Sequence, residues 1–155
     1  MVEREQISSE IKKLFDAQKL GVLSTYGRNQ PYSSLVACAA LKDLKTLIFA
    51  TARSTRKYDN LTRNPPVSLL VDNRSNQDSD FHDAIAVTVT GEAQEIEQHE
   101  RETLLKIYLD KHPSLREFVM SPTCALVKIT VQRFFLVHSF QQVLELSVTP
   151  HEQDT

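Results

Sequence analysis

Apolar and polar residues follow two different periods along the chain. In residues 5–18 and 97–111 the apolar side chains recur at helical spacing, which predicts two amphipathic helices. Residues 84–96 alternate instead, with Ile85, Val87 and Val89 on one side, and they give the clearest strand signal in the chain. Shorter apolar runs bounded by turn residues predict strands at 22–25, 32–41, 46–51, 67–71, 124–131 and 134–140, with a last edge strand at 143–148.

The order of these segments indicates a mainly β fold, an antiparallel barrel of about six strands with flanking helices. We expect a hairpin loop at 26–30 with a positive φ angle at Gly27, a bulge or a bend of the barrel at Gly91 and a tight turn at Gln132-Arg133. The length suits a single domain over residues 1–155, with an N-terminal helix within 1–19 and a tail at 149–155.

The segment from Phe49 to Val71 reads as a strand, a short helix and a second strand. Ser54 is a good N-cap for this helix, because its hydroxyl can accept a bond from a free amide of the first turn. The helix must end near Asn64, since Pro65 disfavours helical geometry in the residue before it.

Positive charge gathers at the start of this short helix. Arg56 and Lys57 lie in the first turn and Arg53 comes just before it, where the helix dipole disfavours each cation by roughly 0.3–1 kcal/mol. The cluster is explained if free amides, the hydroxyls of Ser54 and Thr55 and the two cations hold a phosphate dianion. A solvated basic helix start explains the same residues about equally well.

Composition narrows the function further. A net charge of −2 argues against a general binder of nucleic acid or membrane surfaces, and no apolar run approaches the roughly 20 residues of a membrane span. The N-terminus has no signal-peptide pattern, and Cys38 and Cys124 lie in apolar runs that suit buried free thiols, so we expect a cytoplasmic protein. No metal-binding or nucleophile motif is present, so any redox or transfer chemistry requires a cofactor.

The residues from Thr51 to Val71, with Ser-Thr-Arg-Lys and Asn-Pro-Pro-Val-Ser-Leu-Leu, resemble the FMN-binding split-barrel family related to pyridoxamine 5'-phosphate oxidase. The resemblance extends over about residues 20–140. It implies a homodimer with FMN in a cleft between the subunits, the phosphate at the Ser54–Lys57 helix start, and partner residues from around Phe135 to Phe140. The cofactor-binding residues it implies are Ser33, Ser34, Leu35, Val36, Thr51, Ala52, Thr55, Arg56, Lys57 and Arg74.

Two stretches outside the central segment bear on this site. Small side chains fill much of 32–41, which lets a flat ring approach the backbone but equally suits a crowded barrel interior. The polar loop after Val71 offers Arg74, Asn76 and His82 as a rim, although such loops are usually just solvated. Where the oxidase has Arg-Gln before the next strand, this chain has Asp83-Ala84.

The resemblance implies an FMN-dependent oxidoreductase that transfers hydride or electrons to or from a small molecule. It does not imply the oxidase itself, because the chain has no Trp and lacks that enzyme's C-terminal Trp-Arg-Leu-x-Pro. One alternative is the haem-utilisation branch of split barrels, which Pro31 to Val36 resemble, with His138 and His151 as candidate iron ligands. Another is a non-catalytic flavin-binding dimer or an empty barrel. The sequence names neither the catalytic residues nor the substrate.

Overall fold

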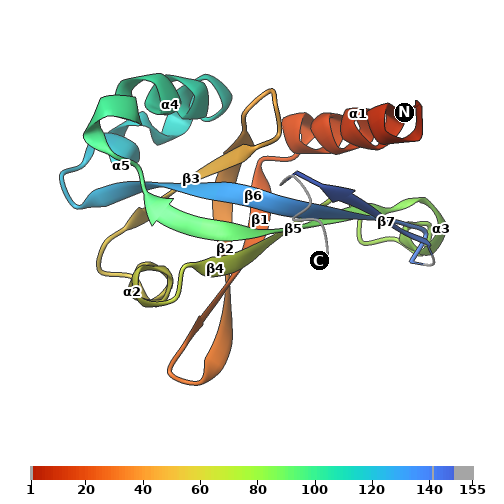
Figure 1. The fold of residues 1–155 in the computed structure, drawn as a ribbon, viewed down its shortest axis with the longest axis horizontal. Helices are drawn as coiled ribbons and strands as arrows, with labels where there is room; N and C mark the ends of the chain where they lie inside the picture. The colour runs from red at the N-terminus through yellow and green to blue at the C-terminus, as the bar shows by residue number, and fades with distance from the viewer. Residues whose placement is uncertain (1, 141, 149–155) are drawn as a thin grey trace, which may run out of the picture.

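We describe residues 2–140 and 142–148 of a computed structural model of the chain (Figure 1). The helices are α1 (Val2–Ala17), α2 (Arg56–Arg63), α3 (Asp80–Asp83), α4 (Gln98–Lys111) and α5 (Arg116–Met120), with a 3-10 turn at Pro113–Leu115. The strands are β1 (Leu20–Gly27), β2 (Gln30–Ala40), β3 (Thr46–Ala52), β4 (Pro66–Asp72), β5 (Ile85–Glu95), β6 (Cys124–His138) and β7 (Gln142–Ser147). The tail expected at 149–155 lies outside the described residues.

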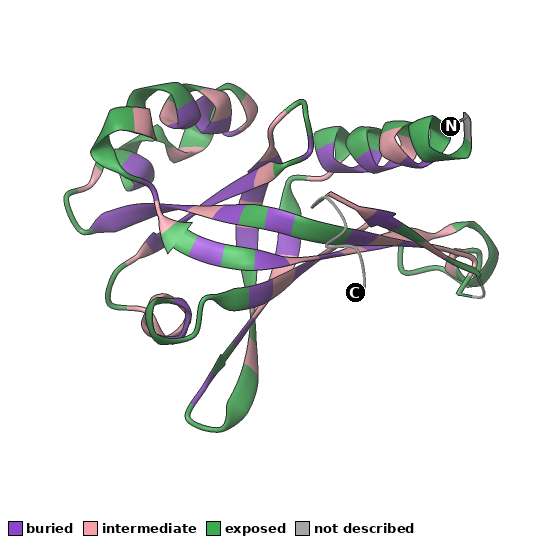
Figure 2. Ribbon diagram, viewed as in Figure 1, coloured by how far each residue is buried: buried purple, intermediate pink, exposed green. Residues whose placement is uncertain are grey.

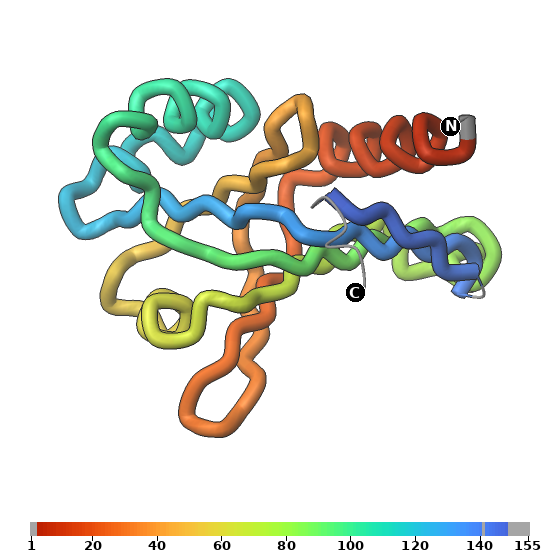
Figure 3. The backbone as a smooth tube through the Cα atoms, viewed as in Figure 1, coloured from red at the N-terminus to blue at the C-terminus, as the bar shows by residue number. Residues whose placement is uncertain are grey.

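The strands form one antiparallel sheet in the order β3-β2-β1-β4-β5-β6-β7, and a further pairing of β3 with β6 closes the first six into a barrel. β7 stays outside the ring, as expected for an edge strand: it pairs with Arg133 to His138 of β6, on the same edge that β3 occupies over Cys124 to Thr130. The β1–β2 hairpin projects well beyond the rest of the barrel, and α2 lies beside its base (Figures 1 and 3). The prediction of a six-stranded antiparallel barrel with flanking helices is confirmed.

The alternating apolar residues of β5 contribute to the hydrophobic core inside the barrel. Val87 and Val89 of β5 point into the barrel interior, where they pack with side chains such as Phe49 and Leu69. One face of α1 closes this cluster, with Phe15 in an edge-to-face contact with Phe134 at 6.2 Å between ring centres (Figure 2). A second cluster forms where α4 covers the outer face of the barrel, on Ala39, Ile48, Ala50, Cys124 and Leu126.

The tight turn expected at Gln132-Arg133 is wrong, because the chain continues there as the single long strand β6. Both halves of β6 pair with β5, and the register shifts so that Thr90 faces Arg133 while Gly91 faces Val131. Gln132 is thus the extra residue of a bulge, and it changes the phase of the alternation in β6 as a turn would. Of the bulge or bend expected at Gly91, the structure has the bulge.

Two other local expectations are corrected. Gly27 does not supply a positive φ; the hairpin turn uses Arg28 (φ 55°) and Asn29 (φ 59°), and Gly27 is needed because a Cβ there would overlap the side chain of Asn60. The N-cap of α2 is Thr55, one residue after the expected Ser54, and its Oγ1 accepts a bond from the Tyr58 backbone N–H at 3.4 Å. The helix ends at Arg63, with Asn64 as its C-cap, as Pro65 requires.

The polar loop between β4 and β5 is built around the carboxylate of Asp80. That carboxylate accepts bonds from the backbone N–H groups of Ser75, Asn76 and Gln77 and from the Ser75 hydroxyl. These bonds hold the pKa of Asp80 below its ordinary value, so the carboxylate is charged at neutral pH. The loop therefore has one defined conformation set by its own side chains.

The C-terminal end of α4 is fastened to β2 by a buried histidine. His112 is 5% exposed, and its Nε2 lies 2.8 Å from the carbonyl oxygen of Cys38. Burial, with smaller effects of Lys111 and Lys19, lowers the pKa of His112, although the Cys38 carbonyl acts in the opposite direction. The ring is therefore neutral at neutral pH and donates its Nε2–H to that carbonyl.

We expect Gly91→Ala to lower the free energy of unfolding by more than about 2 kcal/mol, because its Cβ would overlap the carbonyl oxygen of Thr130 on the paired strand. Urea unfolding at neutral pH measures the change. Gly21→Ala is the control, since the first atom its Cβ meets is Leu69 Cδ1 at 2.9 Å, the end of a side chain that can shift. Equal losses for the two variants would contradict the bulge geometry.

We expect the free energy of unfolding to fall as the pH drops below about 6.5, the ordinary pKa of histidine. His112 has a lowered pKa in the folded chain, so the unfolded chain takes up its proton first and protonation favours unfolding. His112→Gln keeps a side-chain donor without the titration, and its stability should decline less between pH 7 and pH 5. His82→Gln, at an exposed position, serves as control, and a His112→Gln decline as steep as that of the parent would show the reasoning to be mistaken.

Candidate functional site

A gap between β2 and β3 is the main irregularity of the barrel wall. The ladder between them contains the pairs Cys38 with Phe49, Ala39 with Ile48 and Ala40 with Leu47, and the Leu41 N–H bonds to the Thr46 carbonyl oxygen where the turn begins. β3 then runs on against β6 as far as Ala52, while β2 stays paired with β1 but not with β3. The β3-facing edge of β2 over residues 33–37 is consequently a row of backbone groups without a ladder partner.

The start of α2 lies at the far end of β3 and is shaped by two threonines. The Oγ1 atoms of Thr51 and Thr55 are 2.8 Å apart, and each hydroxyl also contacts the carbonyl oxygen of Ala52. Both hydroxyls are thus engaged in forming the strand-to-helix turn. The first backbone N–H groups of a helix have no partner within the helix, and here the Thr55 hydroxyl accepts from one of them, the N–H of Tyr58.

Arg56 and Ser34 carry buried polar atoms that have no protein partner. The Arg56 guanidinium lies over the ring of Tyr32 on β2, 4.7 Å from the ring centre. Its Nε is buried without a hydrogen bond, and so is the hydroxyl oxygen of Ser34 on the same strand. Asn60 Oδ1 is the third such atom among the described residues. Buried polar atoms are nearly always satisfied in folded proteins, so Arg56 Nε and Ser34 Oγ are candidate contacts for a ligand atom or an ordered water.

Lys57 is the second cation of this corner. Partial burial lowers the pKa of its ammonium, and no acidic side chain among the described residues forms a salt bridge with it. Arg53, by contrast, is committed elsewhere: its guanidinium pairs with Glu95 and donates to the carbonyl oxygen of Pro122 at 2.9 Å. Two of the three clustered cations therefore remain available for an anion.

The predicted β2 residues fall on opposite faces of the strand. Val36 is buried in the barrel core, and Ser34 also points inward, whereas Ser33 and Leu35 lie on the outer face. Leu35 is 68% exposed. Its cross-strand neighbour Val22 stands next to Leu70 on β4, so an apolar patch runs across the outer face of the sheet.

Arg74 is not brought to the α2 corner within one chain. Arg74 follows the C-terminal end of β4, whereas α2 precedes the N-terminal end of that strand. The Arg74 guanidinium pairs with the carboxylate of Asp72 at 2.8 Å. Arg74 instead borders a hollow of about 400 Å³ beside the Asp80 loop. Phe81 and Phe140, both exposed and 5.9 Å apart between ring centres, line the same hollow, as does Ala84 of the Asp83-Ala84 pair.

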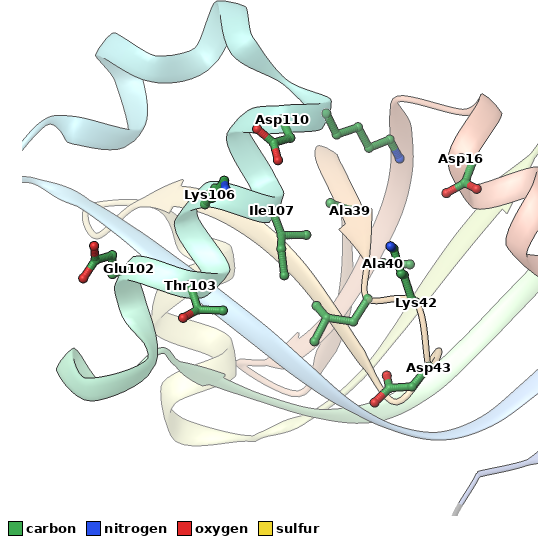
Figure 4. Close-up of a pocket in the computed structure, with 12 residues that line it drawn as sticks. Asp16, Ala39, Ala40, Lys42, Asp43, Glu102, Thr103, Lys106, Ile107 and Asp110 are labelled. Atoms are coloured by element: carbon green, nitrogen blue, oxygen red, sulfur yellow. The ribbon is translucent and has the colours of Figure 1, made fainter.

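A larger cleft of about 910 Å³ lies away from all the predicted residues (Figure 4). Its walls are α4, the end of α1 and the β2–β3 turn, at the end of β3 opposite to α2. Carboxylates and ammonium groups alternate around an apolar floor that includes Ile107, and most of the charged side chains are exposed. The volume suits a small ligand, but this mixture of charges selects no particular chemistry.

The described histidines and the two cysteines show no arrangement for catalysis or metal binding. His138, a candidate iron ligand, has its Nε2 2.9 Å from a carboxylate oxygen of Glu10 on α1, and His151 lies outside the described residues. Cys38 and Cys124 are buried free thiols whose pKa burial raises. Residues 2–140 and 142–148 contain no cluster of His, Cys, Asp or Glu that could hold a metal ion.

Membrane insertion through helices finds no support in the part of the chain that the structure describes. None of the helices there is both long and apolar enough to cross a bilayer.

Two tyrosines at this site were not singled out by the sequence. Tyr32 lies under the Arg56 guanidinium, and the Tyr108 hydroxyl on α4 donates to the carbonyl oxygen of Ala37 at 3.0 Å, where the β2–β3 ladder ends. Tyr108 belongs to the apolar stripe of its helix, which signals only that it is buried. Its contact with a strand about 70 positions earlier has no signature in the sequence.

Comparison with known proteins places this arrangement among related folds. A model of the pyridoxamine 5'-phosphate oxidase family matches residues 7–138. A haem-binding protein from Mycobacterium smegmatis superposes with a TM-score of 0.80 at 18% identity, over 90% of this chain and 57% of that one. General stress protein 26 from Bacillus anthracis gives 0.72 at 22% identity, over 92% and 99%. An FAD-binding protein from Mesorhizobium loti gives 0.65 at 20% identity, over 83% and 91%.

At these identities the structural likeness shows the fold alone. The chain spans little more than half of the Mycobacterium protein, and no curated protein sequence matches it. The family model, by contrast, is a match of sequence and covers most of the chain. The matched residues include every predicted cofactor-binding residue from Ser33 to Arg74.

Proposed function

The chain belongs to the pyridoxamine 5'-phosphate oxidase family, and on that premise we propose that it binds FMN at the α2 corner and along the β2 edge. The main observation in support is the Nε of Arg56, in the first turn of α2, which is buried and has no hydrogen-bond partner among the described residues. A phosphate oxygen there would accept from the guanidinium, which is otherwise left without a partner for a buried donor.

The other groups of the corner support a dianionic ligand. The desolvated ammonium of Lys57 has only the penalty of burial acting on its pKa, so a nearby anion would stabilise its charged form. The N–H groups of the first turn add the partial positive charge of the helix. Thr51, Ala52 and Thr55 hold the turn that positions these donors.

The open edge of β2 supports a flat ring beside the phosphate. Backbone N–H and C=O groups of Ser33 and Leu35 face the gap, where they can bond to the edge of a planar heterocycle. The buried Val36 fixes the strand from the core side. The buried hydroxyl of Ser34 has no partner among the described residues and is available to a sugar-chain or phosphate oxygen of the ligand.

We further propose that the protein is a homodimer with FMN between the subunits. The apolar outer face that contains Leu35, Val22 and Leu70 supports this, because so exposed a leucine on a sheet face suits contact with a second chain. Residues from around Phe135 to Phe140, with Arg74, would then come from the partner subunit and complete the site.

The reaction we propose is hydride or electron transfer to or from a small molecule. FMN supplies that chemistry when bound, while the residues of this chain bind it, orient it and exclude water. Flavin is preferred to haem because the phosphate corner has free cations, whereas His138 is already bonded to Glu10. The buried free thiols Cys38 and Cys124 support a reducing, cytoplasmic setting.

We expect Arg56→Ala combined with Lys57→Ala to weaken FMN binding at least about tenfold, which corresponds to about 1.4 kcal/mol, because both free cations of the corner are lost. Quenching of flavin fluorescence on titration measures the dissociation constant. Arg63→Ala is the matched control, since this exposed arginine is at the other end of the same helix and pairs with Asp59. Equal affinity in the double variant and the parent would refute the phosphate assignment.

We expect Leu35→Lys to shift the protein from dimer to monomer, because it places a charge in the middle of the proposed apolar contact. Light scattering after size exclusion measures the mass. Met120→Lys is the control: Met120 is 54% exposed, but it is on α5, away from this face. A dimer that persists in Leu35→Lys, or a parent protein that is monomeric, would rule out this interface.

An enzyme and a flavin carrier would differ in what reduces and reoxidises the bound flavin. We expect the yellow protein to be bleached under anaerobic conditions by a nicotinamide donor or a small reduced compound, and its colour to return with an acceptor. Flavin absorbance follows both half-reactions. A protein that binds FMN but reacts with no such compound faster than free FMN does would favour the non-catalytic dimer.

A further inference from the structure

We propose that Tyr108 is a positioning residue whose hydroxyl is inserted between β2 and β3 and keeps the gap in the barrel wall open. The expected effect of Tyr108 on ligand binding, the ligand half of this inference, rests on the proposed binding of FMN along the β2 edge. Its effect on the pairing of β2 with β3, the structural half, does not.

The place where the β2–β3 ladder stops is not explained by the strands themselves. The pairs 38–49, 39–48 and 40–47 define the register, so the next pair would join Ala37 to Ala50. β3 remains a regular strand beyond this point and pairs with β6 through Ala50, Thr51 and Ala52. Both segments keep strand conformation beyond the last pair, so the ladder does not end because either strand ends.

The Tyr108 hydroxyl occupies the position of the missing pair. It donates to the carbonyl oxygen of Ala37 at 3.0 Å, and in the register of the ladder this carbonyl is the acceptor that the Ala50 N–H would use. The Tyr108 hydroxyl thus bonds to the carbonyl at which the next bond between the two strands would form. Tyr108 is 1% exposed, and burial raises its pKa well above the ordinary value, so the hydroxyl stays protonated and can donate.

The alternation of the strand shows that this carbonyl faces the gap. The Leu41 N–H donates to the backbone carbonyl of Thr46, on the β3 side of the strand. The Cys38 N–H donates to the backbone carbonyl of Lys19, on the β1 side. Backbone groups of odd-numbered β2 residues therefore point toward β3, and those of even-numbered residues point toward β1. Ala37 is the first odd residue without a β3 partner, and Leu35 and Ser33 follow it along the open edge.

α4 holds the tyrosine in this place from two directions. Leu104 and Leu109 of the same helix are buried with it against the outer face of the barrel. One turn later His112, whose ring centre is 5.0 Å from that of Tyr108, bonds to the Cys38 carbonyl. The helix therefore binds two successive carbonyls of β2, one on each edge, and only the tyrosine contact lies in the gap.

A merely structural role for Tyr108 makes a different prediction. If the hydroxyl only satisfies a buried carbonyl, its loss lowers stability and leaves the gap unchanged. If it separates the strands, its loss lets the Ala50 N–H bond directly to the Ala37 carbonyl, and the ladder extends toward Leu35 and Ala52. The open edge that we propose for the flavin ring is then shortened.

The test is Tyr108→Phe, which removes the hydroxyl and keeps the ring. We expect the Leu35 and Ala52 amides of the flavin-free protein to exchange with solvent at least about tenfold more slowly than in the parent, by NMR under native conditions. We expect its FMN dissociation constant to rise about tenfold. His112→Phe is the matched control, because it removes a bond from α4 to the β1-facing edge, and it should lower stability without either effect.

The outcomes separate this inference from the proposed function. A parent protein that does not bind FMN removes the ligand half, and the amide exchange of Tyr108→Phe then decides the role of the tyrosine alone. A parent that binds FMN with a Tyr108→Phe variant unchanged in both exchange and affinity overturns the inference and leaves the proposed function standing. Equal changes in Tyr108→Phe and His112→Phe would reduce the tyrosine to a structural contact and also overturn it.

Discussion

The closure of the barrel through β3 and β6 is the constraint on which the other features depend. A closed barrel has no free edge, because every strand finds a hydrogen-bonding neighbour on both sides. Here β6 pairs with β3 along the full length of that strand, so closure does not require β2 and β3 to stay together beyond Cys38. The chain can therefore leave one stretch of backbone unpaired in the wall without losing the fold.

The sequence predicted the parts of the fold that local pattern controls. The alternation at Val87 and Val89 defines the barrel interior, and Pro65 ends α2 where expected. The sequence led to wrong predictions where two different structural causes produce the same residue pattern. Gln132 changes the phase of β6 through a bulge, which resembles a turn, and Gly27 is required by the nearby side chain of Asn60 rather than by its φ angle.

In the candidate site, too, the sequence predicted some of the residues and missed others. Arg56 and Lys57 were found from the sequence because cations at a helix start are unusual, and the structure leaves both without a carboxylate partner. Arg53 belonged to the same cluster by sequence, but Glu95, more than forty positions later, takes its charge. Tyr108 had no signal, because the meaning of a buried tyrosine depends on which strand it reaches.

The Asp80 loop has a consequence for the rim of the hollow beside Arg74. Because one carboxylate gathers three backbone N–H groups and a hydroxyl, the loop is already ordered in the isolated chain. A molecule that settles against this wall does not have to freeze a moving segment, and little conformational entropy is lost on contact. Binding at this hollow would therefore depend on how well a ligand fits a wall whose shape Asp80 already sets.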